Sequence, residues 1–245
     1  MLLKAVSHLK GVHPATSSRP RSLAVMAAAK PTIKIEVVSD VVCPWCYVGK
    51  RRLEKAMQQF EGKAQFDVHW LPYQLNPAAG PEAINKLQYY NDKFGPARVA
   101  QIIPNMQQTF ASEGLQYSIG GNTGNTRRAH RLMSWVAKEH GLAKQDALAE
   151  QLFEGYHCKE QNVDDPEFLL SAAAAAGLPR DAAAAALEAS GPGEQLVQQE
   201  LGTYPGVNGV PHFVVNGRQR VGGAQSPDVF AELFEELLQQ QPAAA

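Results

Sequence analysis

The stretch Cys43-Pro-Trp-Cys46 contains two cysteines three residues apart and is the part of the sequence best suited to chemistry. Residues 33–39 before it alternate apolar and polar side chains and then become fully apolar, as in an inner strand. Residues 51–60 after it have the apolar spacing of a helix. The pattern therefore predicts that the cysteine pair lies where a strand is followed by a helix.

This position determines which thiol can react. If Cys43 caps the predicted helix and Pro44 fills its first turn, the Cys43 sulfur faces unpaired backbone N–H groups and the positive end of the helix dipole. Helix N-termini and Cys-x-x-Cys motifs favour the thiolate, which is the attacking species in disulfide exchange. Cys46 lies one turn later on the same face, within bridging distance of Cys43. We therefore predict that Cys43 is the nucleophile and Cys46 the buried resolving thiol.

Zinc binding is the first competing interpretation of the pair. A tetrahedral zinc site needs further ligands, and the sequence has no second Cys-x-x-Cys motif or histidine pair. His157 and Cys158 could complete such a site, although zinc knuckles do not usually carry Pro-Trp between two ligands. Cys158 itself is interpreted as a small buried hydrophobic residue, with a second redox-active or glutathionylated thiol as the alternative.

Composition limits the class of protein. The 245 residues suffice for one large domain or two small ones, and a hydrophobic content of 44% is typical of a soluble globular protein. The net charge of -1 and the lack of a basic stripe beyond the N-terminal segment predict no nucleic-acid partner. No apolar run approaches the roughly 20 residues that cross a membrane, so no membrane association is expected.

Residues 1–30 contain no Asp or Glu but several basic residues, with frequent Ser, Ala and Pro. This composition predicts a transit peptide and an organellar protein, in a chloroplast or mitochondrion, after its removal. A shared helical face of Leu2, Val6 and Leu9 favours a mitochondrion, whereas the Thr-Ser-Ser cluster at 16–18 favours a plastid. A disordered extension on a cytoplasmic protein is the alternative.

Alternating hydrophobicity in residues 64–71 predicts a second strand, parallel to the first because a helix connects them. From about residue 81 to residue 201 the sequence indicates helices separated by Gly and Pro. The clearest of these, at 126–140, has one apolar face and Gly141 after its end. Three further helices are predicted at 143–154, 166–176 and 181–189. Alanine runs in the last two indicate close packing of small residues.

The C-terminal part returns to strands. Residues 210–215 and 218–221 predict two strands joined by an Asn-Gly hairpin turn at 216–217. A last helix is predicted with Ser226 as N-cap and Pro227 in its first position. Its expected buried face consists of Val229, Phe230, Leu233, Phe234 and Leu237.

Three motifs carry a family resemblance: Cys43-Pro-Trp-Cys46, Gly206-Val-x-Gly209-Val-Pro211 before a strand, and Val221-Gly-Gly-Ala224-Gln. With them the chain resembles the DsbA-like thioredoxin superfamily. It is most similar to the FrnE-like branch, which is related to the kappa-class glutathione transferases and 2-hydroxychromene-2-carboxylate isomerases. The resemblance covers nearly everything from about residue 30 to residue 240.

This resemblance implies an α/β protein, namely a thioredoxin-like fold with a large helical insertion domain. Residues 31–78 and 203–241 would form the two parts of the thioredoxin-like domain. Residues 79–202 would form the helical insertion, which agrees with the order of predicted strands and helices. Residues 1–30 would precede the domain as the transit peptide or extension.

The resemblance also implies substrate-binding residues. Pro211 would be a cis-proline facing the cysteine pair, so that the backbone of Val210 could pair with an extended thiol substrate. An ordinary proline at the start of a strand is the alternative. Asn125, His130 and Arg127 would lie at the substrate side of the helix at 126–140. Helix capping is the simpler role for Asn125, and a plain position on the helix face is the alternative for His130.

Two acids precede the pair. Asp40, three residues before Cys43, could relay a proton to the resolving thiol, or it could only solvate the turn. Glu36 lies in the predicted strand beneath. Both are candidates because thiol exchange needs a proton acceptor near the resolving cysteine.

Aromatic residues around the pair are expected to contact substrate. Trp45 should be mostly exposed and, with Pro44 and Tyr47, should border the site as an apolar contact surface. Trp70 and Trp135 are predicted to lie in the core.

The predicted function is a thiol–disulfide oxidoreductase, acting as a reductase, isomerase or oxidase through Cys43 and Cys46. Its partners would be proteins or glutathione that carry thiols or disulfides. No cofactor is expected beyond a reducing partner such as glutathione or thioredoxin. The sequence sets no oligomeric state.

Two other functions remain open. The first is a glutathione-dependent isomerase or transferase on small aromatic substrates, although the related enzymes usually have serine at the position of Cys43. The second is a chaperone-like thiol-binding module in which the helical block forms an apolar groove.

Overall fold

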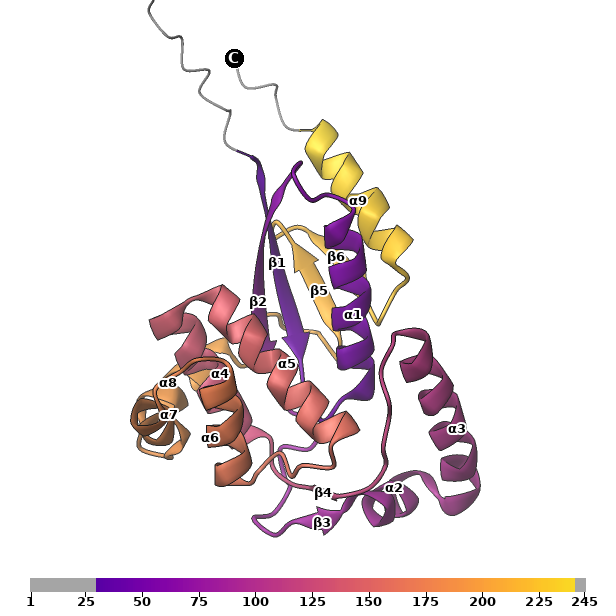
Figure 1. The fold of residues 1–245 in the computed structure, drawn as a ribbon, viewed down its shortest axis with the longest axis vertical. Helices are drawn as coiled ribbons and strands as arrows, with labels where there is room; N and C mark the ends of the chain where they lie inside the picture. The colour runs from indigo at the N-terminus through magenta and orange to yellow at the C-terminus, as the bar shows by residue number, and fades with distance from the viewer. Residues whose placement is uncertain (1–29, 241–245) are drawn as a thin grey trace, which may run out of the picture.

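The computed structural model describes residues 30–240, so the predicted transit peptide lies outside the described residues except for Lys30. The centre of the protein is a four-stranded sheet with the order β2-β1-β5-β6 (Figure 1). β1 (Thr32–Ser39) pairs in parallel with β2 (Gln65–Pro72) and antiparallel with β5 (His212–Val215), which pairs antiparallel with β6 (Gln219–Gly222). The predicted parallel pair and the C-terminal hairpin are therefore confirmed.

β1 is an inner strand because β2 and β5 pair with it on either side, and one of its faces is entirely apolar. Ile33, Ile35 and Val37 have no exposed surface, and they alternate with polar residues as far as position 36. The parallel register pairs Ser39 with Pro72, so the carboxyl ends of β1 and β2 lie side by side at one end of the sheet. The turn that contains Cys43 follows β1 at this end.

α1 (Pro44–Gln58) and α9 (Pro227–Gln239) pack side by side on the same face of the sheet (Figure 1). Phe230 and Phe234 of α9 are fully buried. The Phe234 ring lies 5.6 Å from the ring of Phe60, measured between centroids. These contacts join the first and the last helix of the domain and bury the apolar core between them and the sheet.

The prediction for the start of α9 needs two corrections. Val229, predicted to be buried, is 38% exposed, because Phe230 and Phe234 define the side of the helix that faces the sheet. Ser226 takes the N-cap position as predicted, but its side chain makes no capping hydrogen bond.

The hairpin turn between β5 and β6 has the predicted chemistry. Asn216 and Gly217 have positive φ angles of 49° and 70°, which a two-residue turn of the primed type requires at both positions. The Asn216 side chain also accepts a hydrogen bond from Lys34 N, which ties the turn to β1.

The helical insertion separates β2 from β5. It comprises α2 (Lys86–Phe94), α3 (Pro96–Ser112), α4 (Arg127–His140), α5 (Leu142–Cys158), α6 (Pro166–Ala175), α7 (Arg180–Leu187) and α8 (Pro192–Glu200). Two very short strands, β3 (Ile84–Asn85) and β4 (Asn122–Thr123), pair antiparallel within it. The four individually predicted helices correspond to α4, α5, α6 and α7. Among the described helices, none is long and apolar enough to cross a membrane.

The insertion has two parts that lie on different sides of α1. Helices α4 to α8 form a bundle, and α5 packs against β2, whereas α2 and α3 form an arm beside α1 (Figure 1). Ala172, Ala173, Ala183 and Ala186 are buried where α6 and α7 pack together. The alanine runs therefore act as close-packing surfaces, as predicted.

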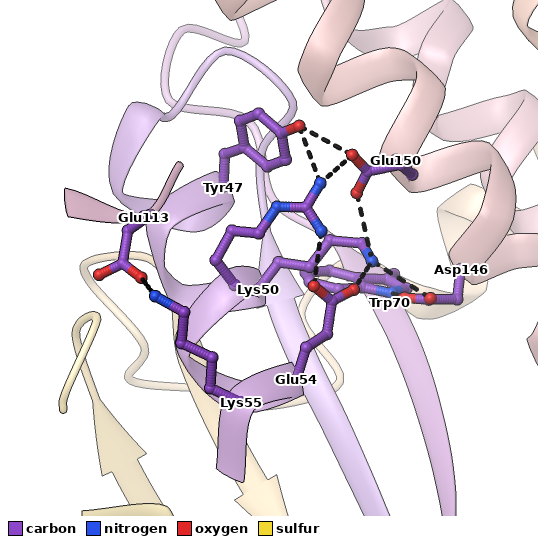
Figure 2. Close-up of polar contacts among 9 residues, drawn as sticks. Tyr47, Lys50, Glu54, Lys55, Trp70, Glu113, Asp146 and Glu150 are labelled. Carbon is purple, nitrogen blue, oxygen red and sulfur yellow. Dashed lines mark hydrogen bonds and ion pairs between the residues drawn. The ribbon is translucent and has the colours of Figure 1, made fainter. Parts of the chain in front are cut away.

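A buried ionic cluster joins α1 to α5 (Figure 2). The Nζ atom of Lys50 lies 3.2 Å from Asp146 Oδ2 and 3.5 Å from Glu150 Oε2, and it also pairs with Glu54. Trp70 of β2 donates its indole N–H to Asp146 Oδ1 at 2.9 Å. Burial alone would lower the pKa of Lys50, but the surrounding carboxylates outweigh it and raise that pKa. The charged Lys50 side chain therefore links α1 to α5, and Asp146 extends this link to Trp70 of β2.

Candidate active site

The cysteine pair lies at the start of α1, as predicted. Cys43 occupies the N-cap position, Pro44 the first helical position, and the Cys46 N–H donates to Cys43 O at 3.0 Å. Both cysteines are reduced. Cys43 is 5% exposed and faces a cavity, whereas Cys46 has no exposed surface.

The Cys43 sulfur does not cap the helix through a hydrogen bond, contrary to the simplest expectation. It lies instead 3.5 Å from Val210 O, so the thiol can donate to that carbonyl. The peptide bond between Val210 and Pro211 is cis, the geometry that the family resemblance implies. The Cys43 sulfur therefore lies next to the backbone of the C-terminal half.

Two further contacts hold the Pro211 segment. Gly223 N, in the second half of the Val221-Gly-Gly-Ala224 motif, donates to Pro211 O at 2.8 Å. Gly49 permits α1 to approach closely, because a Cβ atom at Gly49 would lie 3.1 Å from Pro211 Cγ. Gly49 was not identified from the sequence, since a glycine inside a helix gives no local signal of a distant neighbour.

The environment of Cys46 favours the protonated thiol. Burial raises the pKa of Cys46 well above its ordinary value, and the neighbouring Cys43 sulfur raises it further, as a hydrogen-bond partner and as a like charge. Contacts with Ser39 and Asp40 oppose this rise but do not cancel it. Cys46 therefore retains its proton while Cys43 faces the cavity.

Asp40 is completely buried, so the interpretation that it solvates the turn is wrong. Its Oδ2 atom accepts a hydrogen bond from Leu75 N at 2.7 Å. Its Oδ1 atom lies 3.3 Å from His130 Nε2 but has no hydrogen-bond partner of good geometry. Asp40 is one of the residues that line the cavity next to Cys43. Glu36, by contrast, accepts a hydrogen bond from the hydroxyl of Tyr204.

Two histidines of the insertion hold the segments next to the cysteines. His130 of α4 is 4% exposed, with Nε2 at 2.9 Å from Tyr73 O. His157 of α5 lies with Nε2 at 3.0 Å from Val41 O, two residues before Cys43. Burial, reinforced by nearby Lys86, lowers the pKa of His157 to about 3, so His157 is neutral and donates to that carbonyl. Neither histidine lines the cavity.

Asn125 has a capping and bridging position. Its Oδ1 atom accepts hydrogen bonds from Arg127 N at 2.9 Å and from Gln74 Nε2 at 3.0 Å. Its Nδ2 group donates to Ala79 O at 2.9 Å. The Arg127 guanidinium pairs with Glu194, and this hydrogen bond is the main reason why the pKa of Glu194 falls to about 2. Both side chains thus hold structure together around the start of α4.

The aromatic residues behave as predicted except for Tyr47. Trp45 is 44% exposed, while Trp70 and Trp135 are buried. Tyr47 does not border the site, because its side chain points away from it into the core. Its ring stacks on Phe153 with 5.4 Å between the centroids. Its hydroxyl donates to Glu150 at 2.8 Å (Figure 2).

A cavity of about 480 Å³ opens beside Cys43. The start of α1 contributes Pro44 and Trp45 to its lining, and the opposite wall comes mainly from the arm. Residues of the arm and of α5 that the sequence did not single out for this role are Tyr89, Tyr90, Phe94, Ile102, Met106 and Tyr156. They were missed because their apolar spacing is indistinguishable from that of core residues.

The third cysteine and metal binding complete the description. Cys158 ends α5, is half-buried rather than fully buried, and has a pKa that burial raises. Within residues 30–240 no group of three or more His, Cys, Asp or Glu side chains is arranged to hold a metal ion.

Fold and cysteine pair together define a thioredoxin-like protein of the DsbA class. The family model of the DsbA-like thioredoxin domain matches residues 34–235, and the chain belongs to this family. It is 26% identical over 223 residues to the uncharacterized protein YwbO of Bacillus subtilis, a match that covers 84% of this chain and 97% of that protein.

Solved structures agree with this assignment. A probable DsbA oxidoreductase from Streptomyces coelicolor superposes with a TM-score of 0.75 at 29% identity, covering 87% of this chain and 93% of that one. A 2-hydroxychromene-2-carboxylate isomerase superposes with a TM-score of 0.60 at 15% identity, covering 84% and 97%, and shares the fold. The predicted thioredoxin-like fold and its family are thus confirmed.

Proposed function

We propose that this protein is a thiol–disulfide oxidoreductase in which Cys43 is the nucleophile and Cys46 the resolving thiol. The position of Cys43 carries the proposal: it begins α1, lines the cavity, and lies 3.5 Å from Val210 O. Cys46, one turn later and fully buried, cannot meet a substrate first. This division between one thiol that lines the cavity and one fully buried thiol suits disulfide exchange.

The reaction proceeds in two exchanges. The Cys43 thiolate attacks one sulfur of a substrate disulfide, forms a mixed disulfide and releases the other sulfur as a thiolate. Cys46 then loses its proton and attacks the Cys43 sulfur, which forms the Cys43–Cys46 disulfide and releases the second substrate thiolate. The substrate gains the two electrons that the pair loses. Asp40, the buried carboxyl group beside Cys43, is the candidate acceptor for the Cys46 proton.

The substrates are proteins or glutathione that carry thiols or disulfides. The backbone of Val210 and Pro211 offers an extended substrate segment a strand to pair with. A reducing partner such as glutathione or thioredoxin returns the oxidised pair to the dithiol. The reduction potential of the pair decides whether reduction, isomerisation or oxidation prevails.

The test is insulin reduction in the presence of a thiol reductant. Cys43→Ser should lose the catalysed rate, and Cys46→Ser should accumulate a mixed disulfide that mass spectrometry detects and a reductant releases. Cys158→Ser is the matched control and should retain the rate. Full activity in Cys43→Ser would refute the proposal.

A second candidate is a glutathione-dependent isomerase or transferase acting on small aromatic substrates. The aromatic lining of the cavity, including Tyr89, Tyr90 and Phe94, favours it. Under this alternative, glutathione would be required for turnover of an aromatic substrate, and disulfide exchange would be absent. Retained isomerase or transferase turnover in Cys46→Ser would also favour it, because that reaction needs no resolving thiol.

A further inference from the structure

The cavity beside Cys43 gathers four of the six large hydrophobic side chains that are exposed among the described residues. Six large hydrophobic side chains are exposed among residues 30–240: Trp45, Leu75, Ile84, Leu87, Phe94 and Val229. All but Leu87 and Val229 line this one cavity. Because scattered apolar residues need no explanation but a contiguous apolar patch marks a binding site, the cavity mouth is a recognition surface.

Inside the mouth the walls remain apolar. Tyr90, Met106 and Tyr156 are buried and line the cavity floor or walls. Burial raises the pKa of Tyr90 above its ordinary range, so its hydroxyl stays neutral. A volume of about 480 Å³ falls within the roughly 300–1,000 Å³ typical of small-molecule sites. An aromatic ring is therefore the kind of group that the cavity can enclose.

The charges at the mouth are not balanced. Lys93 and Arg98 line the cavity, and among the described residues neither forms a salt bridge. Lys93 donates only to the hydroxyl of Tyr89, at 3.2 Å. Glu82 is the one exposed acid of the lining, and the buried Asp40 is turned to Leu75 N. The exposed part of the lining thus carries two cations and one acid next to aromatic walls, and the buried Asp40 supplies the second acid.

We propose that this cavity binds the organic part of a small disulfide substrate, namely an aromatic group that carries a carboxylate. The ring would lie among the apolar walls, the carboxylate near Lys93 and Arg98, and the sulfur at Cys43. This inference rests on the proposed function and specifies its substrate class. It concerns the arm side of the site, which the strand-like contact at Val210 does not use.

The chemistry balances with such a substrate. The Cys43 thiolate attacks one sulfur of the aromatic disulfide, forms a mixed disulfide and expels one aromatic thiolate. Cys46 passes its proton to Asp40, attacks the Cys43 sulfur and expels the second thiolate. One disulfide is reduced to two thiolates while the dithiol becomes the Cys43–Cys46 disulfide. A thiol reductant then restores the dithiol.

The experiment is a single turnover of the fully reduced protein with two aromatic disulfides. Dithiobis(nitrobenzoate) carries carboxylates, whereas dithiodipyridine is uncharged, and both release a coloured thiol. Each rate is divided by the rate of the same disulfide with free glutathione, which removes differences in intrinsic reactivity. At low salt the double variant Lys93→Ala/Arg98→Ala should slow the acidic disulfide about tenfold and leave the uncharged one unchanged.

A steric pair of variants tests the cavity itself. Ile102→Trp fills the cavity and should slow both aromatic disulfides at least about tenfold. Ile103→Trp, on the neighbouring and equally half-buried position of α3, does not line the cavity and should leave both rates unchanged.

The outcomes separate this inference from the proposed function. Insulin reduction that persists in the charge and steric variants, together with aromatic-disulfide rates that none of these variants alters, would overturn the cavity assignment alone. Loss of every exchange reaction only in Cys43→Ser would leave the proposed function intact. Equal slowing of the two disulfides by the charge variants would overturn the carboxylate assignment.

Discussion

The cations of the ionic cluster beside α1 have carboxylate partners, whereas those at the mouth of the cavity have none among the described residues. On the side of α5, Lys50 and Arg51 are surrounded by Glu54, Asp146 and Glu150, and Lys50 is almost completely buried (Figure 2). On the side of the arm, Lys93 and Arg98 have exposed side chains without carboxylate partners among the described residues.

The difference separates positioning from binding. The ionic cluster fixes α5 against α1, and α5 in turn supplies the His157 that holds Val41. The arm is fixed to α1 mainly at its far end, where Glu113 pairs with Arg52 at 2.8 Å and with Lys55 at 2.6 Å. The opposite end of the arm lines the cavity. Charges satisfied within the protein stabilise it, whereas charges left free remain available to a ligand.

The largest expected effect is loss of the ionic cluster. Lys50→Met should lower the free energy of unfolding by about 2 to 3 kcal/mol, because three carboxylates lose their buried cation. The value lies at the lower limit for buried pairs, since the partner side chains keep 24% to 38% exposure. Urea unfolding followed by circular dichroism measures it. A loss below about 0.5 kcal/mol would mean that the ionic cluster does not hold α5 against α1.

The next largest effect is a loss of folding stability at acidic pH. His157 has a pKa of about 3 in the folded protein and an ordinary value of 6.5, so its contribution is intact above pH 6.5 and is lost as the pH falls towards 3. At about pH 5 the loss should reach about 2 kcal/mol.

Unfolding free energies of the wild type and His157→Gln, measured from about pH 7 to about pH 5, isolate this contribution. The glutamine amide can still donate to Val41 O but does not titrate. Parallel pH profiles for the two proteins would contradict a buried neutral His157.

A smaller effect should appear in alkali. Burial lowers the pKa of Lys86 from 10.5 to about 8, and its Nζ donates to Tyr156 O at 2.7 Å rather than to a carboxylate. The unfolded chain therefore binds more protons than the folded one between pH 8 and 10.5, so stability rises as the pH increases through this window.

From about pH 7 to about pH 9 the gain should be about 1.4 kcal/mol. Lys86→Met lacks the titrating group, and thermal unfolding of both proteins across this range should show a gain only in the wild type. An equal gain in the variant would assign the effect to other groups.

The smallest effect on stability is expected for Lys93, at the mouth of the cavity. Lys93→Met, the matched counterpart of Lys50→Met, should change the free energy of unfolding by less than about 0.5 kcal/mol. Urea unfolding under identical conditions compares the two. A loss as large as that of Lys50→Met would remove the contrast between the ionic cluster and the mouth of the cavity.

Much of the fold could be predicted because its signals are local. The alternation of Ile33, Ile35 and Val37, the Asn-Gly turn at 216–217 and the glycine after α4 each depend on neighbouring residues only. The exposed Val229 shows where such reasoning ends. Helical periodicity gives the orientation of an apolar face to within about one residue, and packing partners decide its edge.

The site was predictable in part for the same reason. The Cys43 and Cys46 spacing and Pro44 place the pair at a helix start by local rules. Tyr47 follows the pair directly but belongs to the core, because α5 covers that side of α1. His130 and Asn125 were expected near substrate; neither lines the cavity, and both make structural hydrogen bonds, that of Asn125 to Ala79 of the cavity lining.

The sequence by itself determined the Cys43-Pro-Trp-Cys46 pair, its place between a strand and a helix, and, by resemblance, its counterpart Val210-Pro211. Tertiary structure alone decided that Asp40 is buried, that the arm lines a cavity, and that Lys93 and Arg98 have no carboxylate partner among the described residues. The physical reason is the range of the interactions. Backbone preferences act over a few residues, whereas burial and charge pairing depend on groups that only folding brings together.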